Sequence, residues 1–171
     1  MKKELHAFDF DGCLMRSPLP EEGKPIWKEK TGTEWPHKGW WSKKESLDNK
    51  VFDIQCNKNI VERLFKAESE GHDNILLTSR LRYLSEEVMI LCELHNIKLK
   101  HAYFKHFKLE KPELLHKVAI EGGYDTVYFY DDRDKEINLM KELLKTDLPY
   151  TLVVHQVCSE TGAIKQILTN K

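Results

Sequence analysis

The sequence predicts an α/β fold in which a Rossmann-like open parallel sheet of about five strands carries helices on both faces. Short apolar segments alternate along the chain with longer amphipathic segments, and this alternation is typical of parallel sheets. The 171 residues contain 40% hydrophobic and 32% charged side chains, a balance typical of a globular protein with its own core. We therefore expect one domain over residues 1–171.

Each expected element has its own local signal. Apolar or β-branched runs predict strands at 5–8, 75–77, 100–104, 126–130 and 150–154. Apolar residues at helical spacing predict helices at 59–68, 83–95, 112–121 and 134–145. Gly71 and the Gly122–Gly123 pair fit helix ends, Ser85 fits a helix N-cap, and Pro112 fits a first helical turn. The residues from about 160 onward show no clear pattern.

Residues 15–56 interrupt the alternation between the first strand and the first helix. A strand-to-helix link normally has ~2–6 residues. This one contains several prolines and all four tryptophans of the chain, Trp27, Trp35, Trp40 and Trp41. We expect a cap or lid beside the site. Its tryptophans either stack on nucleobases or form a small core of the insert, and a mixed arrangement with Trp40 packed and Trp41 exposed also fits.

Composition and charge exclude several classes of protein. A net charge of -1 gives no general attraction to nucleic acids or membranes. The four scattered cysteines form no C-x-x-C pair, and the histidines lack zinc-site spacing. The N-terminus does not resemble a signal peptide, and no apolar run approaches the ~18 residues of a membrane span. These features favour a soluble, cytoplasmic protein with no membrane partner.

Acidic and hydroxyl side chains follow three of the predicted strands, at 9–11, 78–80 and 131–134. Ligands of open parallel sheets bind beyond the carboxyl ends of the strands, so we expect these segments to form one site. The Asp9 carboxylate can attack phosphorus to form an aspartyl-phosphate, while Asp11 can protonate the leaving oxygen and then deprotonate water. Gly12 lets the backbone turn sharply away. The structural alternative is a strand end with solvated acids.

The other two segments supply groups that suit a bound phosphate and a metal. Asp131 and Asp132 add carboxylate oxygens, the ligands that Mg²⁺ prefers. The Thr78 hydroxyl and neighbouring N–H groups suit a phosphate oxygen, although strand-end hydroxyls also form ordinary local hydrogen bonds. Together with Asp9 and Asp11 they predict a magnesium-dependent phosphate-transferring site.

These residues resemble the motifs of the haloacid dehalogenase (HAD) superfamily. Its first motif, Asp-x-Asp after an apolar lead-in, is similar to HAFDFDGCLM; its second, an apolar strand ending in Thr or Ser, to ILLTS; its fourth, a strand followed by acids, to VYFYDD. The resemblance implies that Asp9 is nucleophile and metal ligand. It implies that Asp11 is general acid/base with its backbone carbonyl on the metal, and that Asp131 and Asp132 complete a Mg²⁺ site.

The third motif of the superfamily is a lysine before the fourth strand, and two lysines compete for it. Phe107-Lys108 is similar to the Phe-Lys of one branch, and Lys111-Pro112 is similar to the Lys-Pro of others. We prefer Lys108 as the catalytic lysine and expect Lys111 to contact substrate.

A narrower resemblance is to the HAD-like domain of Swiss Army Knife RNA repair proteins and their small phage and viral relatives. It covers roughly residues 5 to 137 and includes Trp35-Pro36-His37, Gly39-Trp40-Trp41 and Asp131-Asp132-Arg133. Three positions depart from the pattern: Cys13 replaces a usual Thr, Ser79 stands where Gly is common, and Glu136 where His is common. The resemblance implies a role on RNA ends.

Arginines and lysines near the site leave the substrate open. Ser79, Arg80, Arg133, Lys111 and Trp41 are candidate substrate-binding residues, since arginine suits bidentate phosphate recognition. The alternative for both arginines is a structural pair with the nearby acids. Lysines are frequent in the insert and at 98–117, where they either bind nucleic acid or form solvated faces.

Three functions are therefore compared. The first is a phosphomonoesterase that acts on phosphorylated RNA or DNA ends, in particular 3′-phosphates. The second is a phosphatase of a nucleotide or other small molecule, which needs the same catalytic residues. The third is a catalytically silent binding module, which predicts the loss of an acid, whereas Asp9, Asp11 and Asp131 are all present.

Overall fold

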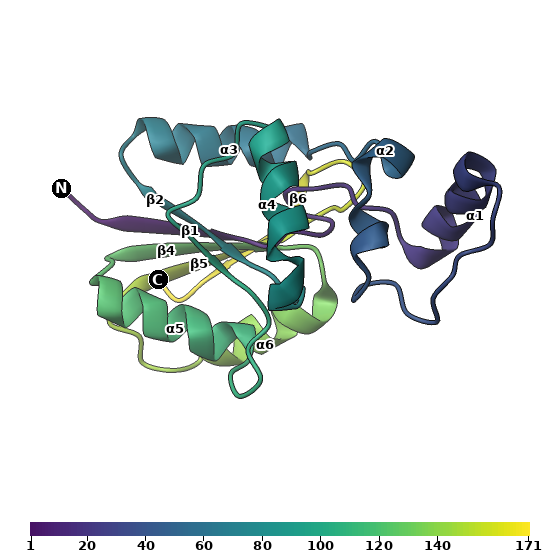
Figure 1. Ribbon diagram of the computed structural model, residues 1–171. Coiled ribbons are helices and arrows are strands. Elements are labelled where there is room, and N and C mark those ends of the chain that lie inside the picture. Colours follow the sequence, from purple (N-terminus) through teal and green to yellow (C-terminus); the bar gives the residue numbers. More distant parts are fainter.

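A six-stranded sheet forms the centre of the molecule in the computed structural model, which describes residues 1–171 (Figure 1). The strand order is β3-β2-β1-β4-β5-β6. β1 to β5 are parallel, and β6 pairs antiparallel with β5 at the edge. The strands are β1 (Glu4–Phe8), β2 (Asp73–Leu77), β3 (His101–Tyr103), β4 (Thr126–Asp131), β5 (Thr151–Val157) and β6 (Ile164–Thr169). The predicted fold class is confirmed.

Helices cover both faces of the sheet. α3 (Lys58–Ser69) and α4 (Ser85–Leu94) lie on one face, and α5 (Lys111–Gly122) and α6 (Asp134–Leu144) lie on the other (Figure 1). The side chains of β1 alternate between the two cores: Phe8 belongs to the α3–α4 side, and Leu5 and Ala7 belong to the α5–α6 side. Burial on both faces explains why the central strands are continuous apolar runs. No helix is long and apolar enough to cross a membrane.

Two local expectations are corrected. The unassigned C-terminal segment contains β6, whose residues are mostly exposed because it is an edge strand. Its weak hydrophobic alternation is the reason for the missing prediction. Ser85 is the first residue of α4 and makes no capping hydrogen bond, because a 3-10 turn, η2 (Arg82–Leu84), leads directly into the helix.

The strand order places the predicted site at a topological switch point. β1 pairs with β2 on one side and with β4 on the other, so the chain leaves β1 in one direction and crosses to β4 later. Asp9 follows β1 directly, Thr78 follows β2, and Asp131 ends β4. The three predicted segments therefore meet at one edge of the sheet, where ligands bind in such folds.

The insert extends from this same edge (Figure 1). It contains α1 (Pro20–Thr31), the 3-10 turn η1 (Lys44–Leu47) and α2 (Asn49–Phe52). Trp40 is 4% exposed, packs at a tilt against Trp35 and edge-on against Phe52, and donates from Nε1 to the Pro18 carbonyl at 3.0 Å. Trp41 is 42% exposed. The mixed arrangement is thus the observed one: Trp40 holds the insert together and Trp41 faces solvent.

Gly23 in α1 provides a test of this packing. A Cβ there would lie 2.1 Å from Cη2 and 2.4 Å from Cζ2 of Trp40. Gly23→Ala should therefore lower the free energy of unfolding by about 1–3 kcal/mol, although alanine favours a helix. Because every tryptophan lies in the insert, urea denaturation followed by tryptophan fluorescence reports on it. Lys24→Ala, one residue later and exposed, is the control; equal stability of the two variants would contradict the packing argument.

Candidate active site

A buried lysine joins two buried carboxylates at the switch point. Lys111 Nζ lies 2.8 Å from Asp9 Oδ1 and 2.6 Å from Asp131 Oδ2. The three residues are 7%, 4% and 0% exposed, respectively. Burial alone would lower the pKa of Lys111, but the charges of Asp9 and Asp131 raise it above the ordinary value. The lysine is therefore held in its charged form.

Asp132 completes a cluster of three acids. One carboxylate oxygen from each of Asp9, Asp131 and Asp132 lies within 4.8 Å of the others. Burial, followed by repulsion from Asp131, raises the pKa of Asp9 well above its usual range and that of Asp132 to about 7. Asp132 Oδ1 is buried without a hydrogen-bond partner. An unpaired oxygen among repelling carboxylates fits a divalent cation such as Mg²⁺.

Gly12 allows Asp132 to reach this position. Its φ is +70°, and a Cβ at Gly12 would lie 2.4 Å from Asp132 Oδ2. Gly12 is therefore required for two reasons: the turn after β1 needs its positive φ, and the Asp132 side chain that follows β4 occupies the space of a Cβ. Cys13, which follows Gly12, is completely buried and belongs to the core on the α3–α4 side of the sheet.

Asp11 lies apart from the acid cluster and pairs with Arg80. Arg80 Nε and Nη2 donate to the two Asp11 oxygens, each at 2.8 Å, and the Ser17 hydroxyl also donates to Asp11. Arg80 Nη1 donates to the Trp41 carbonyl at 2.7 Å and to the Ser46 hydroxyl at 2.9 Å. The guanidinium lies 5.1 Å from the Trp41 ring. One arginine thus ties Asp11 to the insert.

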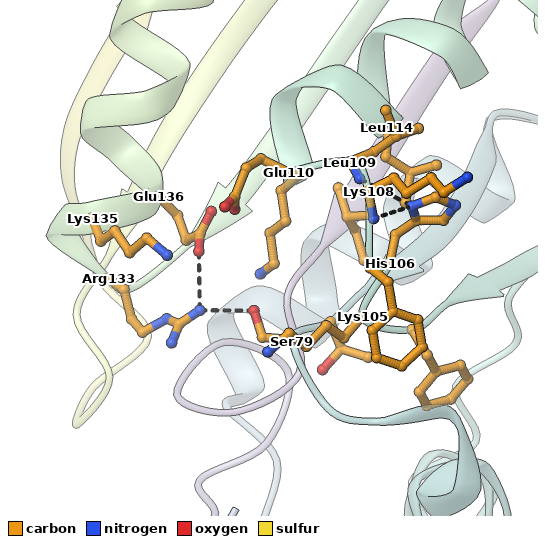
Figure 2. A pocket seen from close by; sticks show the side chains of 15 residues that line it. Ser79, Lys105, His106, Lys108, Leu109, Glu110, Leu114, Arg133, Lys135 and Glu136 are labelled. Carbon is orange, nitrogen blue, oxygen red and sulfur yellow. Dashed lines mark hydrogen bonds and ion pairs between the residues drawn. The ribbon is translucent and has the colours of Figure 1, made fainter.

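A second arginine bridges β2 and β4 at the mouth of the site. Arg133 Nη2 donates to Ser79 Oγ at 2.8 Å and to Glu136 Oε1 at 3.1 Å (Figure 2). Burial would lower the pKa of Arg133, but the nearby Asp9 and Asp131 raise it, so this cation stays charged near the acids. The Thr78 hydroxyl is buried and accepts from the Arg80 N–H at 3.1 Å, which fixes the turn after β2.

The acids open into a cavity of about 530 Å³. It is lined by Asp9 and Asp11 together with Trp41, Ser79 and Arg133. The insert also contributes residues that the sequence did not indicate: Arg16, Ser17, Leu19 and Glu22. Their types and spacing match no motif, and they become visible only once the insert is folded against the sheet.

Two residues lie elsewhere than the sequence led us to expect. Lys108, preferred as the catalytic lysine, is exposed and its backbone N–H donates to His106, whereas Lys111 contacts Asp9, so the structure favours Lys111 for that position. The reason is the start of α5, because Lys111 is its first residue and Glu110 and Glu113 form a capping box there. Arg80 lines the cavity but is 3% exposed, and its donors are used by Asp11 and the insert, as in the structural alternative of a pair with a nearby acid; substrate binding by Arg80 stays a prediction.

Other assignments are brought together as expected. Asp9, Asp131 and Asp132 form the acid cluster, while Trp41 and Ser79 face the cavity. The Asp11 carboxylate is outside the cluster, so a contact of Asp11 with metal through its backbone carbonyl stays a prediction.

The two lysines form a matched pair for a stability test. Lys111→Met removes the cation between two buried carboxylates and should lower the free energy of unfolding by about 3–5 kcal/mol in metal-free buffer near pH 7. Lys108→Met, three residues earlier and exposed, should change it by no more than about 0.5 kcal/mol. Chemical denaturation measures both. Equal effects would contradict the placement of Lys111.

The fold is shared with two solved structures of low sequence identity. A chain of the Pnkp1/Rnl/Hen1 complex has a TM-score of 0.58 at 18% identity, over 91% of this chain and 45% of that one. A haloacid dehalogenase-like family hydrolase from Streptococcus pneumoniae has a TM-score of 0.52 at 11% identity, over 82% and 80%. No protein-family model and no curated protein matches the sequence. The chain spans less than half of the first structure's chain, and it has the haloacid dehalogenase-like fold.

Proposed function

We propose that the protein is a magnesium-dependent phosphomonoester hydrolase with Asp9 as its nucleophile. The observation that carries the proposal is the contact of Lys111 with both Asp9 and Asp131 at the carboxyl end of the sheet. A buried cation beside a carboxylate nucleophile offsets the charge of an incoming phosphate, which the acids alone would repel. The HAD-like fold supports this reading.

In the first step, an Asp9 oxygen attacks phosphorus and the bond from phosphorus to the leaving alcohol oxygen breaks. Asp11 supplies a proton to that oxygen. Asp11 accepts from Arg80 through both oxygens, so it must give up at least one of these bonds to act as an acid. Lys111 and Arg133 provide positive charge near the phosphoryl oxygens.

In the second step, water attacks the phosphorus of the aspartyl-phosphate and Asp11 takes its proton. The bond between phosphorus and Asp9 breaks, which releases inorganic phosphate and restores the carboxylate. The Arg80 and Ser17 contacts hold Asp11 in a fixed orientation between the two steps.

Asp9, Asp131 and Asp132 are the residues that would hold the magnesium ion, together with the Asp11 carbonyl. A bound Mg²⁺ supplies charge neutralisation for the phosphate and lowers repulsion among the carboxylates. The buried, unpaired Asp132 Oδ1 and the raised pKa of Asp132 support this assignment.

For the substrate we propose a phosphorylated nucleic-acid end. The supporting observation is that the cavity over Asp9 is lined partly by the insert and shares Ser79, Lys105 and Arg133 with a lysine-lined cavity beside it. The likeness to a chain of the Pnkp1/Rnl/Hen1 complex is consistent with this choice. The rival with the same chemistry is a phosphatase of small phosphoesters, and the presence of the complete acid set disfavours a silent module.

Replacement of the nucleophile is the direct test. Asp9→Asn should lower kcat for p-nitrophenyl phosphate with Mg²⁺ about a thousandfold or more, because an amide does not form the phosphoryl intermediate. Asp147→Asn is the matched control, since Asp147 is exposed in the loop before β5 at the other end of the strands. Activity of Asp9→Asn near that of the control would exclude the mechanism.

Magnesium should stabilise the fold through Asp132. At 10 to 100 times its dissociation constant, Mg²⁺ should raise the free energy of unfolding by about 1.4–2.7 kcal/mol. Asp132→Asn should lose most of this gain, yet be at least as stable as wild type without metal, because repulsion from Asp131 is removed. Thermal denaturation with and without Mg²⁺ measures both effects. The same gain in Asp132→Asn would rule out this metal site.

A further inference from the structure

A second cavity adjoins the one above Asp9. It has a volume of about 470 Å³ and is lined by the loop 104–110 between β3 and α5, by the turn after β2 and by the starts of α5 and α6 (Figure 2). Both cavities are lined by Ser79, Lys105 and Arg133, so the two share a rim. A nucleic-acid strand whose terminal phosphate reaches Asp9 can therefore extend past these three residues into the second cavity.

The charge of the second cavity suits a polyanion. Lys105, Lys108 and Lys135 line it, and none of them forms an ion pair with a carboxylate. Two acids also line it: Glu136 is paired with Arg133, and the Glu110 side chain accepts from the backbone N–H of Glu113 in the capping box of α5, so the lysines still outnumber the acids. The lysine ammonium groups are thus free to contact phosphodiester oxygens.

The loop also exposes an aromatic ring. Phe107 is 91% exposed, although burial of a phenylalanine side chain away from water is favourable. The loop is nevertheless shaped by its own hydrogen bonds: His106 Nδ1 accepts from the backbone N–H of Lys108 at 3.1 Å and of Leu109 at 3.0 Å. The backbone N–H of Lys105 also donates to the Arg80 carbonyl at 2.9 Å, which fixes the loop to the catalytic edge. Phe107 is therefore presented by a defined turn.

We propose that the loop 104–110 is a subsite for the nucleotide next to the terminal phosphate of a single-stranded nucleic acid. Phe107 stacks on its base, and Lys105 and Lys108 contact the phosphodiester. This inference rests on the proposed function in one respect, that the terminal phosphate lies at Asp9. Base stacking on an aromatic ring beside a basic groove is the common mode of single-strand recognition. A small phosphoester would fill the first cavity and leave this one unused.

Binding and hydrolysis are measured separately. Binding is measured with the Asp9→Asn protein, which does not hydrolyse the substrate, in the presence of Mg²⁺. The ligand is a fluorescently labelled hexanucleotide with a 3′-phosphate, as RNA and as DNA, and its fluorescence anisotropy is followed. A second substitution in this protein, Phe107→Ala, should weaken binding about 5- to 100-fold, whereas Phe107→Trp should retain it. Lys105→Ala and Lys108→Ala should each weaken binding and lower its salt dependence. Ile120→Ala and Lys117→Ala, exposed on α5 outside the loop, are the matched controls.

Hydrolysis then separates the two proposals. In the wild-type background, Phe107→Ala should raise KM for the hexanucleotide and leave kcat/KM for p-nitrophenyl phosphate unchanged. Hexanucleotide binding that Phe107→Ala does not weaken, or equal losses on both substrates, would overturn the subsite. Absence of p-nitrophenyl phosphate hydrolysis in the wild type, with Phe107-dependent binding retained, would instead overturn the proposed hydrolase and keep the subsite. The ratio of the affinities for the RNA and the DNA hexanucleotide shows which nucleic acid the subsite prefers.

Discussion

The contact of Lys111 with Asp9 and Asp131 is the constraint on which the site depends. It joins the end of β1, the end of β4 and the first residue of α5, three elements that are distant in sequence. Two carboxylates buried side by side would repel each other, and a buried unpaired charge costs several kcal/mol. The ammonium group of Lys111 has three donors and pairs with both carboxylates at once. The start of α5 is therefore set by electrostatics at the sheet edge as well as by its capping box.

Arg80 forms a second set of long-range contacts, which connect Asp11 to the insert. Its guanidinium holds Asp11 through two bonds and the insert through the Trp41 carbonyl and the Ser46 hydroxyl. A bidentate arginine–carboxylate pair has strict geometry, so a shift of the insert must move Arg80 or break the pair. The insert therefore influences the orientation of Asp11 as well as the shape of the cavity.

The sequence predicts the parts of this molecule that depend on local pattern. Strand ends with acids locate Asp9, Asp131 and Asp132, because parallel strands bring their carboxyl ends together. The sequence does not distinguish Lys108 from Lys111, since the choice depends on where α5 begins relative to a turn held by His106. It allows a pair of Arg80 with a nearby acid but does not indicate the contacts of Arg80 with the insert, whose residues are more than thirty positions away. A contact between single polar side chains far apart in the chain produces no periodic pattern in the sequence, so it is not predicted from the sequence.

The two segments that shape substrate access are both anchored at the turn after β2. The Arg80 side chain holds the insert, while the Arg80 carbonyl accepts from Lys105 at the start of the loop 104–110. Ser79 faces both cavities and binds Arg133 from the β4 side. The buried acids lie at strand ends and the buried lysine at the start of α5, whereas the residues that would contact the substrate lie on loops. Such a division lets loops change specificity while the sheet edge keeps the chemistry. The short turn between β2 and η2 therefore links Asp11, the insert and the proposed nucleotide subsite.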